Sequence, residues 1–243
     1  MKNWLIAIIA VIALGVVVFL SGLETATPSG VPLIRSSNQL VEVNNKAAVL
    51  AFGIFQNADN GLKVSDDDKA KLREALKLFE AMRLFDPTRV QSNLGAGKCY
   101  MILGEKEKAA ERFEQAIVNK NLDPDREKAN FKLTIYECMA LLSEVTLDIG
   151  VEEIANYNSL SQAHDTAGAA LAKNRAETYL GKALDYSNQA VLAVPEATRY
   201  LIGRANVLLV MKRDEDAKKD VARAKALAPS DPRVLMMAKV VGL

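Results

Sequence analysis

The sequence predicts an all-α fold, a solenoid of stacked helical hairpins. Four prolines, Pro87, Pro124, Pro195 and Pro229, each follow an amphipathic helical stretch. They are separated by 37, 71 and 34 residues. Because the middle separation is nearly twice the other two, the chain has a repeat of about 35 residues. A repeat of this length is typical of helical hairpins that stack and bury a continuous core, and such stacks usually act as binding surfaces.

The opening hairpin is expected to comprise a helix over 46–57 and a second helix over 66–85, joined by a loop over 58–65. Ser65 can cap the second helix. The three aspartates that follow Ser65 are favoured near a helix N-terminus by the helix dipole. We therefore expect the second helix to begin directly after Ser65.

The next hairpin shows the repeating unit most clearly. Its first helix begins near Val90 and ends at Gly104, as a glycine just past the last turn should end it. Its second helix covers 106–118. Gly97 and Ala109 are small residues placed where the two helices of the hairpin must approach closely. We predict that both lie at this contact.

The middle of the chain leaves two alternatives open. Residues 125–148 are expected to form one long helix ending at Gly150, and residues 167–194 form one or two more. These helices are either two degenerate repeats or one enlarged repeat with an insertion. A further repeat is expected over 198–231. A last helix over 231–241 should then cover the end of the stack.

This pattern resembles the tetratricopeptide repeat (TPR) family, whose unit has small and aromatic residues at fixed places, a glycine at the turn and a terminal proline. The clearest hairpin matches at Gly97, Tyr100, Gly104, Ala109, Phe113 and Ala116. The last repeat matches at Leu201, Ala205, Leu208, Ala217, Ala224 and Pro229, with Val221 replacing the aromatic and Lys212 the turn glycine. The resemblance implies an α-solenoid over 45–243 that binds other proteins.

The N-terminus is strongly apolar. Residues 4–23 carry no charge, and about 20 helical residues span the ~30 Å hydrocarbon core of a bilayer. The alternatives are a transmembrane anchor over 1–23 and a cleaved signal peptide. We favour the anchor because no small-x-small pair follows the apolar run. Lys2 lies before the run and Glu24 after it. The positive-inside tendency therefore predicts a single-pass protein with a cytoplasmic N-terminus and an extracytoplasmic repeat domain.

The segment 24–44 has a different composition. Thr, Ser, Gly, Pro and Asn dominate it, and Pro28 and Pro32 oppose helix formation. We expect an extended tether between the membrane anchor and the repeats.

The overall composition argues against several functions. The formal net charge of +1 gives no reason to expect a nucleic-acid partner. The glycine-rich stretch over 93–98 lacks the Gly and the Ser or Thr of a phosphate-binding loop, since Ser92 and Cys99 stand at those places. His164 is the only histidine, and Cys99 and Cys138 are distant from it, so a metal cluster is not expected. We expect no cofactor, no metal and no enzymatic activity.

By the TPR resemblance, a partner would lie against the first helices on the concave face. The candidate partner-binding residues are Gln91, Leu94, Lys98, Met101, Ile102, Arg199, Ile202, Asn206 and Leu209. The set is mostly aliphatic, which suits an amphipathic helix of a protein or peptide partner. The alternative is that the chain's own final helix or tether fills this surface.

The C-terminal helix is unusually apolar for the end of a solenoid. Its large residues are spread around its circumference and cannot all face inward. Those expected to support self-association are Leu235, Met236, Val240 and Leu243. The sequence therefore predicts a membrane-tethered TPR scaffold, with a self-assembling structural subunit as the alternative.

Overall fold

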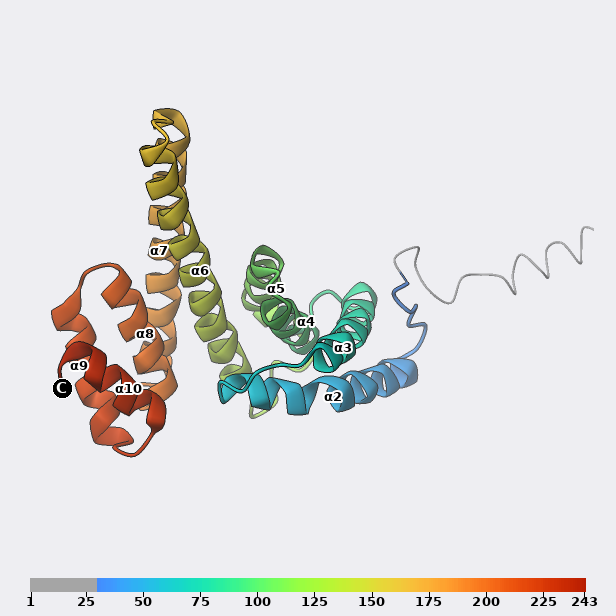
Figure 1. The fold of residues 1–243 in the computed structure, drawn as a ribbon. Helices are drawn as coiled ribbons and strands as arrows, with labels where there is room; N and C mark the ends of the chain where they lie inside the picture. The colour runs from blue at the N-terminus through green and yellow to red at the C-terminus, as the bar shows by residue number, and fades with distance from the viewer. Residues whose placement is uncertain (1–29) are drawn as a thin grey trace, which may run out of the picture.

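A computed structural model describes residues 30–243 (Figure 1). The predicted all-α class is confirmed for these residues, which form nine α-helices and one short 3₁₀ turn. The helices are α2 (Ser37–Asp59), α3 (Asp66–Phe85), α4 (Val90–Leu103), α5 (Lys106–Val118), α6 (Phe131–Gln162), α7 (Thr166–Ala193), α8 (Thr198–Val210), α9 (Asp214–Leu227) and α10 (Pro232–Val241). The proposed anchor over 4–23 lies outside the described residues. Among residues 30–243, no helix combines the length and apolarity that crossing a membrane requires.

The first hairpin, α2 and α3, differs from expectation at its start. Residues 37–44, expected to belong to an extended tether, form the first two turns of α2. The reason is local capping: the Ser36 side chain accepts a hydrogen bond from the backbone N–H of Gln39. The Gln39 side chain in turn accepts one from the backbone N–H of Arg35. At α3 the expected cap is confirmed, because Ser65 and Asp68 form a reciprocal capping box.

The second hairpin, α4 and α5, has the predicted boundaries and packing. Gly104 ends α4 in a left-handed conformation (φ 82°). Gly97 lies against the ring of Phe113 on α5, where an added Cβ would come within 2.4 Å of a ring carbon. Gly95 makes the equivalent approach to Phe79, which belongs to the preceding hairpin. Two glycines of one helix therefore set its distance to both neighbouring helices.

The middle of the chain is one enlarged hairpin of two long helices, α6 and α7, so the two-repeat alternative is wrong. Helix α6 does not stop at Gly150, because this glycine is a packing position: an added Cβ would lie 3.0 Å from Leu180 on α7. The turn comes later, where His164 adopts a left-handed conformation (φ 60°). Asp165 then caps α7 by accepting a hydrogen bond from the backbone N–H of Gly168.

The last hairpin, α8 and α9, is covered by α10. Lys212 takes the turn position that glycine holds in the TPR pattern, and it adopts a left-handed φ of 59°. One face of α10 packs against α8 and α9, as expected of a terminal helix, through Val234, Met237, Ala238 and Val241. The hairpins α2/α3 and α4/α5 lie on one side of α6, and α8, α9 and α10 lie on the other (Figure 1).

Charged side chains also tie neighbouring hairpins together. Glu80 on α3 accepts hydrogen bonds from Arg112 on α5 (2.9 Å), from Arg83 (2.8 Å) and from the Tyr100 hydroxyl (3.3 Å). Burial disfavours the ionised form of Glu80, but the hydrogen bonds from the two arginines outweigh it and lower its pKa. This network fixes α3, α4 and α5 relative to one another.

Candidate protein-binding site

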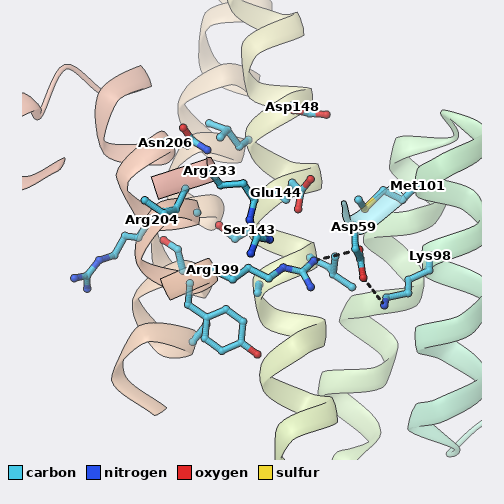
Figure 2. Close-up of a pocket in the computed structure, with 18 of the residues that line it drawn as sticks. Asp59, Lys98, Met101, Ser143, Glu144, Asp148, Arg199, Arg204, Asn206 and Arg233 are labelled. Carbon is cyan, nitrogen blue, oxygen red and sulfur yellow. Dashed lines mark ion pairs between the residues drawn. The ribbon is translucent and has the colours of Figure 1, made fainter. Parts of the chain in front are cut away.

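A hollow of about 360 Å³ opens on the inner side of the stack, between α4 and the end of α2 on one side and α6 and α8 on the other (Figure 2). It contains six of the nine residues predicted to bind a partner. These are Lys98, Met101 and Ile102 from α4, and Arg199, Ile202 and Asn206 from α8. Two helices about a hundred residues apart in the sequence therefore face the same space, across α6.

A second hollow of about 740 Å³ adjoins the first. It lies between α2, α4 and the start of α6, and it shares Phe55 and Lys98 with the first hollow. Its walls include the exposed apolar residues Val41 and Phe52 on α2. We call the two adjoining hollows together the trough.

The other three predicted residues do not line the first hollow. Gln91 is exposed and lines the second hollow. Leu94 also lines it, but only 5% of its surface is accessible because it belongs to the core between α4, α5 and α6. Leu209 lines neither hollow and packs instead with the core of α8, α9 and α10.

An ion-pair chain crosses the first hollow (Figure 2). Asp59, the last residue of α2, lies 3.6 Å from Arg199 on α8 and 3.7 Å from Lys98 on α4. Lys98 makes a closer pair with Glu137 on α6, at 2.6 Å, and its amino group lies 5.4 Å from the ring centre of Phe55. Asp59 and Arg199 are each about one-third exposed, so their pair contributes ~0–1 kcal/mol. The first and last hairpins are therefore joined across the trough by a weak contact.

Two more carboxylates, Glu144 and Asp148, line the hollow from α6. The surrounding helices partly desolvate the Glu144 carboxyl, and this raises its pKa. The positive charge of Arg199 lowers the pKa, whereas the negative charges of Asp148 and Asp59 raise it further. Glu144 nevertheless keeps exposed surface. The hollow therefore combines apolar walls with an acidic side provided by α6.

Sequence reasoning missed the acidic residues of the site. The TPR resemblance places groove residues on the first helix of each hairpin, and α6 departs from the repeat pattern that would identify its groove face. A signal was present, since Glu137, Glu144 and Asp148 follow one another at intervals of seven and four residues and so share one face of a helix. Arg233, which enters the hollow from α10, could not be placed without knowing where α10 packs.

The possible metal ligands and the two cysteines are the remaining reactive groups of the described residues. Within 30–243, no group of three or more His, Cys, Asp and Glu residues is placed to hold a metal ion. Cys99 and Cys138 are both buried and free. Burial raises the pKa of the Cys99 thiol to about 12, so the thiol stays protonated at neutral pH.

The outer face of α10 is a separate apolar surface. All four residues expected to support self-association are exposed, three on α10 and Leu243 just after it, and Met236 and Val240 are exposed most strongly, at 64% and 63%. Leu235 and Leu243 are also exposed. Contact between copies of the chain at this face stays a prediction.

Comparison with protein-family models and with curated proteins finds no match. Twelve chains of solved structures match, and the three described next have low overall similarity to this chain. The structure titled MamA RS-1 ArsTM double mutant is 16% identical, with a TM-score of 0.28, over 76% of this chain and 96% of its own. YrrB, described as a TPR protein with an unusual peptide-binding site, is 15% identical, with a TM-score of 0.29, over 84% of this chain and 98% of its own. The Cut9–Hcn1 hetero-tetramer of the APC/C is 17% identical, with a TM-score of 0.25, over 84% of this chain and 46% of its own. TM-scores this low do not establish a common overall fold, so the TPR-like description rests on the hairpins themselves.

Proposed function

We propose that this chain is a TPR-like scaffold that binds a protein or peptide partner in the trough. One observation carries the proposal: residues predicted on α4 and on α8 line one hollow, although the two helices belong to different hairpins. A surface assembled from several elements of a solenoid suits an extended or helical partner segment better than a small molecule.

The walls of the trough favour an amphipathic helix as the bound segment. Apolar side chains from three elements line it, including Phe55 on α2, Met101 on α4 and Ile202 on α8. The sequence left open that the chain's own final helix or the tether over 24–44 fills this surface. Residues 37–44 of that segment belong to α2 and form a wall of the second hollow. The buried face of α10 packs on α8 and α9, and only Arg233 of α10 reaches the hollow. An amphipathic helix of another protein is therefore the occupant that we propose.

The proposal includes membrane attachment. Residues 4–23 are uncharged and long enough to span a bilayer. We propose that they anchor the chain with its N-terminus in the cytoplasm and the repeats on the other side of the membrane. The full-length protein should then resist alkaline extraction from membranes. A mature protein whose first residue lies after position 20 would show instead that this segment is a cleaved signal peptide.

A second candidate function, self-assembly, is favoured by the exposed apolar face of α10. Terminal units of solenoids normally present a polar outer face, whereas α10 exposes Leu235, Met236 and Val240. Contacts between unlike ends of a chain produce open assemblies. A structural subunit that polymerises through α10 is therefore the alternative to the scaffold.

A photo-crosslinking experiment in native membranes tests the scaffold. A crosslinking amino acid would replace Asn206, which is exposed and lines the hollow, or Leu192 as a matched control. Leu192 is 81% exposed on α7 and lines neither hollow. We expect a discrete adduct with another protein from position 206 and none from position 192. Equal adducts from both positions, or none from position 206, would refute binding in the trough. An adduct of twice the chain mass from position 206 would identify a second copy as the occupant.

Reducing the apolar walls should weaken the same interaction. Met101→Ala and Ile202→Ala each remove part of a wall, and central apolar anchors of an interface contribute more than ~1 kcal/mol each. The yield of the adduct from position 206 should therefore fall about fivefold or more in either variant.

A further inference from the structure

We infer that the helix bound in the trough carries a lysine or arginine that pairs with Glu144 and Asp148. This inference rests on the proposed function and names the chemistry of the partner. It follows from the pairing of the charged residues that line the first hollow.

Each cation of the hollow already has a carboxylate. Lys98 pairs with Glu137 at 2.6 Å, and Arg233 pairs with Asp231 at 3.0 Å. Arg204 makes a two-pronged contact with Asp220, through hydrogen bonds of 2.7 and 2.6 Å, and its guanidinium points away from the hollow (Figure 2). These cations are not free to attract an acidic partner.

The fourth cation, Arg199, pairs with Asp59 at 3.6 Å. An acidic partner would have to displace Asp59 and would also meet Glu144, so the hollow opposes negative charge. The charges of the hollow therefore distinguish an acidic partner helix from a basic one, and they favour the basic helix.

Two carboxylates that line the hollow from α6, Glu144 and Asp148, lack a close cation of their own among the described residues. Among residues 30–243, Glu144 has no hydrogen-bond or ion-pair partner. Asp148 has Lys106 at 3.5 Å, but Lys106 makes a closer pair of 2.7 Å with Glu152. Glu144 and Asp148 therefore provide negative charge that the described chain offsets only in part, through Arg199 near Glu144 and the shared Lys106 beside Asp148.

The spacing of these carboxylates fits one cation. They lie four residues apart on α6, so they are neighbours on one face, where two like charges repel each other. Leu147 and Ala140 line the same hollow beside them. A helix with one apolar face and a basic residue at its edge would cover Leu147 and place its cation between Glu144 and Asp148. The cation would relieve the repulsion.

Three synthetic peptides test the inference. They share one apolar face of leucines at helical spacing and carry lysine, glutamine or glutamate on the polar face. Their affinities for the full-length protein in an uncharged detergent would be measured by fluorescence anisotropy. We expect the lysine peptide to bind most tightly and the glutamate peptide least tightly. The lysine peptide should also lose affinity as the salt concentration rises, because salt screens exposed charges.

The decisive variant is Glu144→Gln combined with Asp148→Asn. It should weaken the lysine peptide about three- to tenfold and leave the glutamine peptide unchanged. The control Glu107→Gln removes an exposed carboxylate of α5 that lines neither hollow, and it should change nothing. Glu144→Lys should shift the preference toward the glutamate peptide. Melting followed by circular dichroism would show that each variant is folded.

The outcomes separate this inference from the proposed function. Equal affinity for all three peptides, a preference for the glutamate peptide, or unaltered binding of the lysine peptide by the double variant would overturn the inference. None of those results bears on binding in the trough, which the adducts from position 206 test separately. If none of the three peptides binds, both the inference and the helix-binding function fail.

Discussion

The contact between Gly97 and Phe113 predicts the effect of adding a single methyl group. In Gly97→Ala the new Cβ would lie 2.4 Å from one ring carbon of Phe113 and 2.7 Å from another. Phe113 is fully buried, so its ring cannot swing into solvent. Overpacking of this kind costs ~1–3 kcal/mol. Alanine also gains ~1 kcal/mol over glycine in a helix interior, so the net effect on the free energy of unfolding is a loss of about 0–2 kcal/mol.

Gly53→Ala on α2 is the matched control. Gly53 is also inside a helix, but an added Cβ has no neighbour within 4 Å, so only the helix-propensity gain remains. The two variants should therefore differ by about 1–3 kcal/mol, with Gly97→Ala melting roughly 2–12 °C below Gly53→Ala. Thermal unfolding of the full chain, followed by circular dichroism, measures this difference. If Gly97→Ala melts as high as Gly53→Ala, the packing described for α4 and α5 is incorrect.

Three further predictions concern other parts of the molecule. Lys212→Gly should raise the free energy of unfolding by about 0.5–1 kcal/mol in urea titrations, because a non-glycine residue is disfavoured at φ 59°; a loss of stability would contradict this. Glu80→Gln should be less stable at pH 7 by about 1.5–3 kcal/mol because it removes the charge that accepts hydrogen bonds from Arg112 and Arg83, although Arg112 keeps its pair with Glu111. The pKa of Glu80 is lowered on folding, so its charge stabilises the fold above its ordinary pKa of 4.5 and this contribution is lost as the pH falls. The difference between Glu80→Gln and wild type should therefore narrow toward pH 3, and a constant difference would count against the role of the charge. Leu235→Glu with Val240→Glu should convert oligomers of the full chain in detergent to monomers by light scattering, whereas an unchanged mass would exclude association through α10.

The sequence predicted those helices whose ends and contacts are encoded locally. The boundaries of α4 and α5 follow from the glycine at their turn, and the approach of Gly97 to the second helix follows from its place in the repeat. The start of α2 was missed although a local signal existed. Ser36 and Gln39 have the spacing of a capping box. Pro28, Pro32 and the polar residues around them favour an extended segment instead.

The long hairpin shows where local patterns stop being informative. Gly150 can end a helix or allow a neighbouring helix to approach, and only the position of Leu180 on α7 decides between the two. The residues of the site could likewise be predicted only in part from local patterns. Apolar residues of α4 and α8 were expected in a groove, but their meeting across α6 depends on how three hairpins stack. The position of Asp59 between Lys98 and Arg199 joins residues that no local pattern relates.

Because α6 and α7 are long, a small rotation at the base of their hairpin produces a larger displacement at its tip. At about 1.5 Å per residue, α6 with its 32 residues is roughly 48 Å long, against roughly 21 Å for the 14 residues of α4. The ion pairs that tie this hairpin to α5 reach Glu152 on α6 and Lys182 on α7, and the part beyond them projects from the stack (Figure 1). A rotation of about 5° at the base of this projection would move the turn at His164 by roughly 2 Å. A spectroscopic label at that turn would magnify small rearrangements around the trough, so the tip of the hairpin is a natural place from which to observe binding.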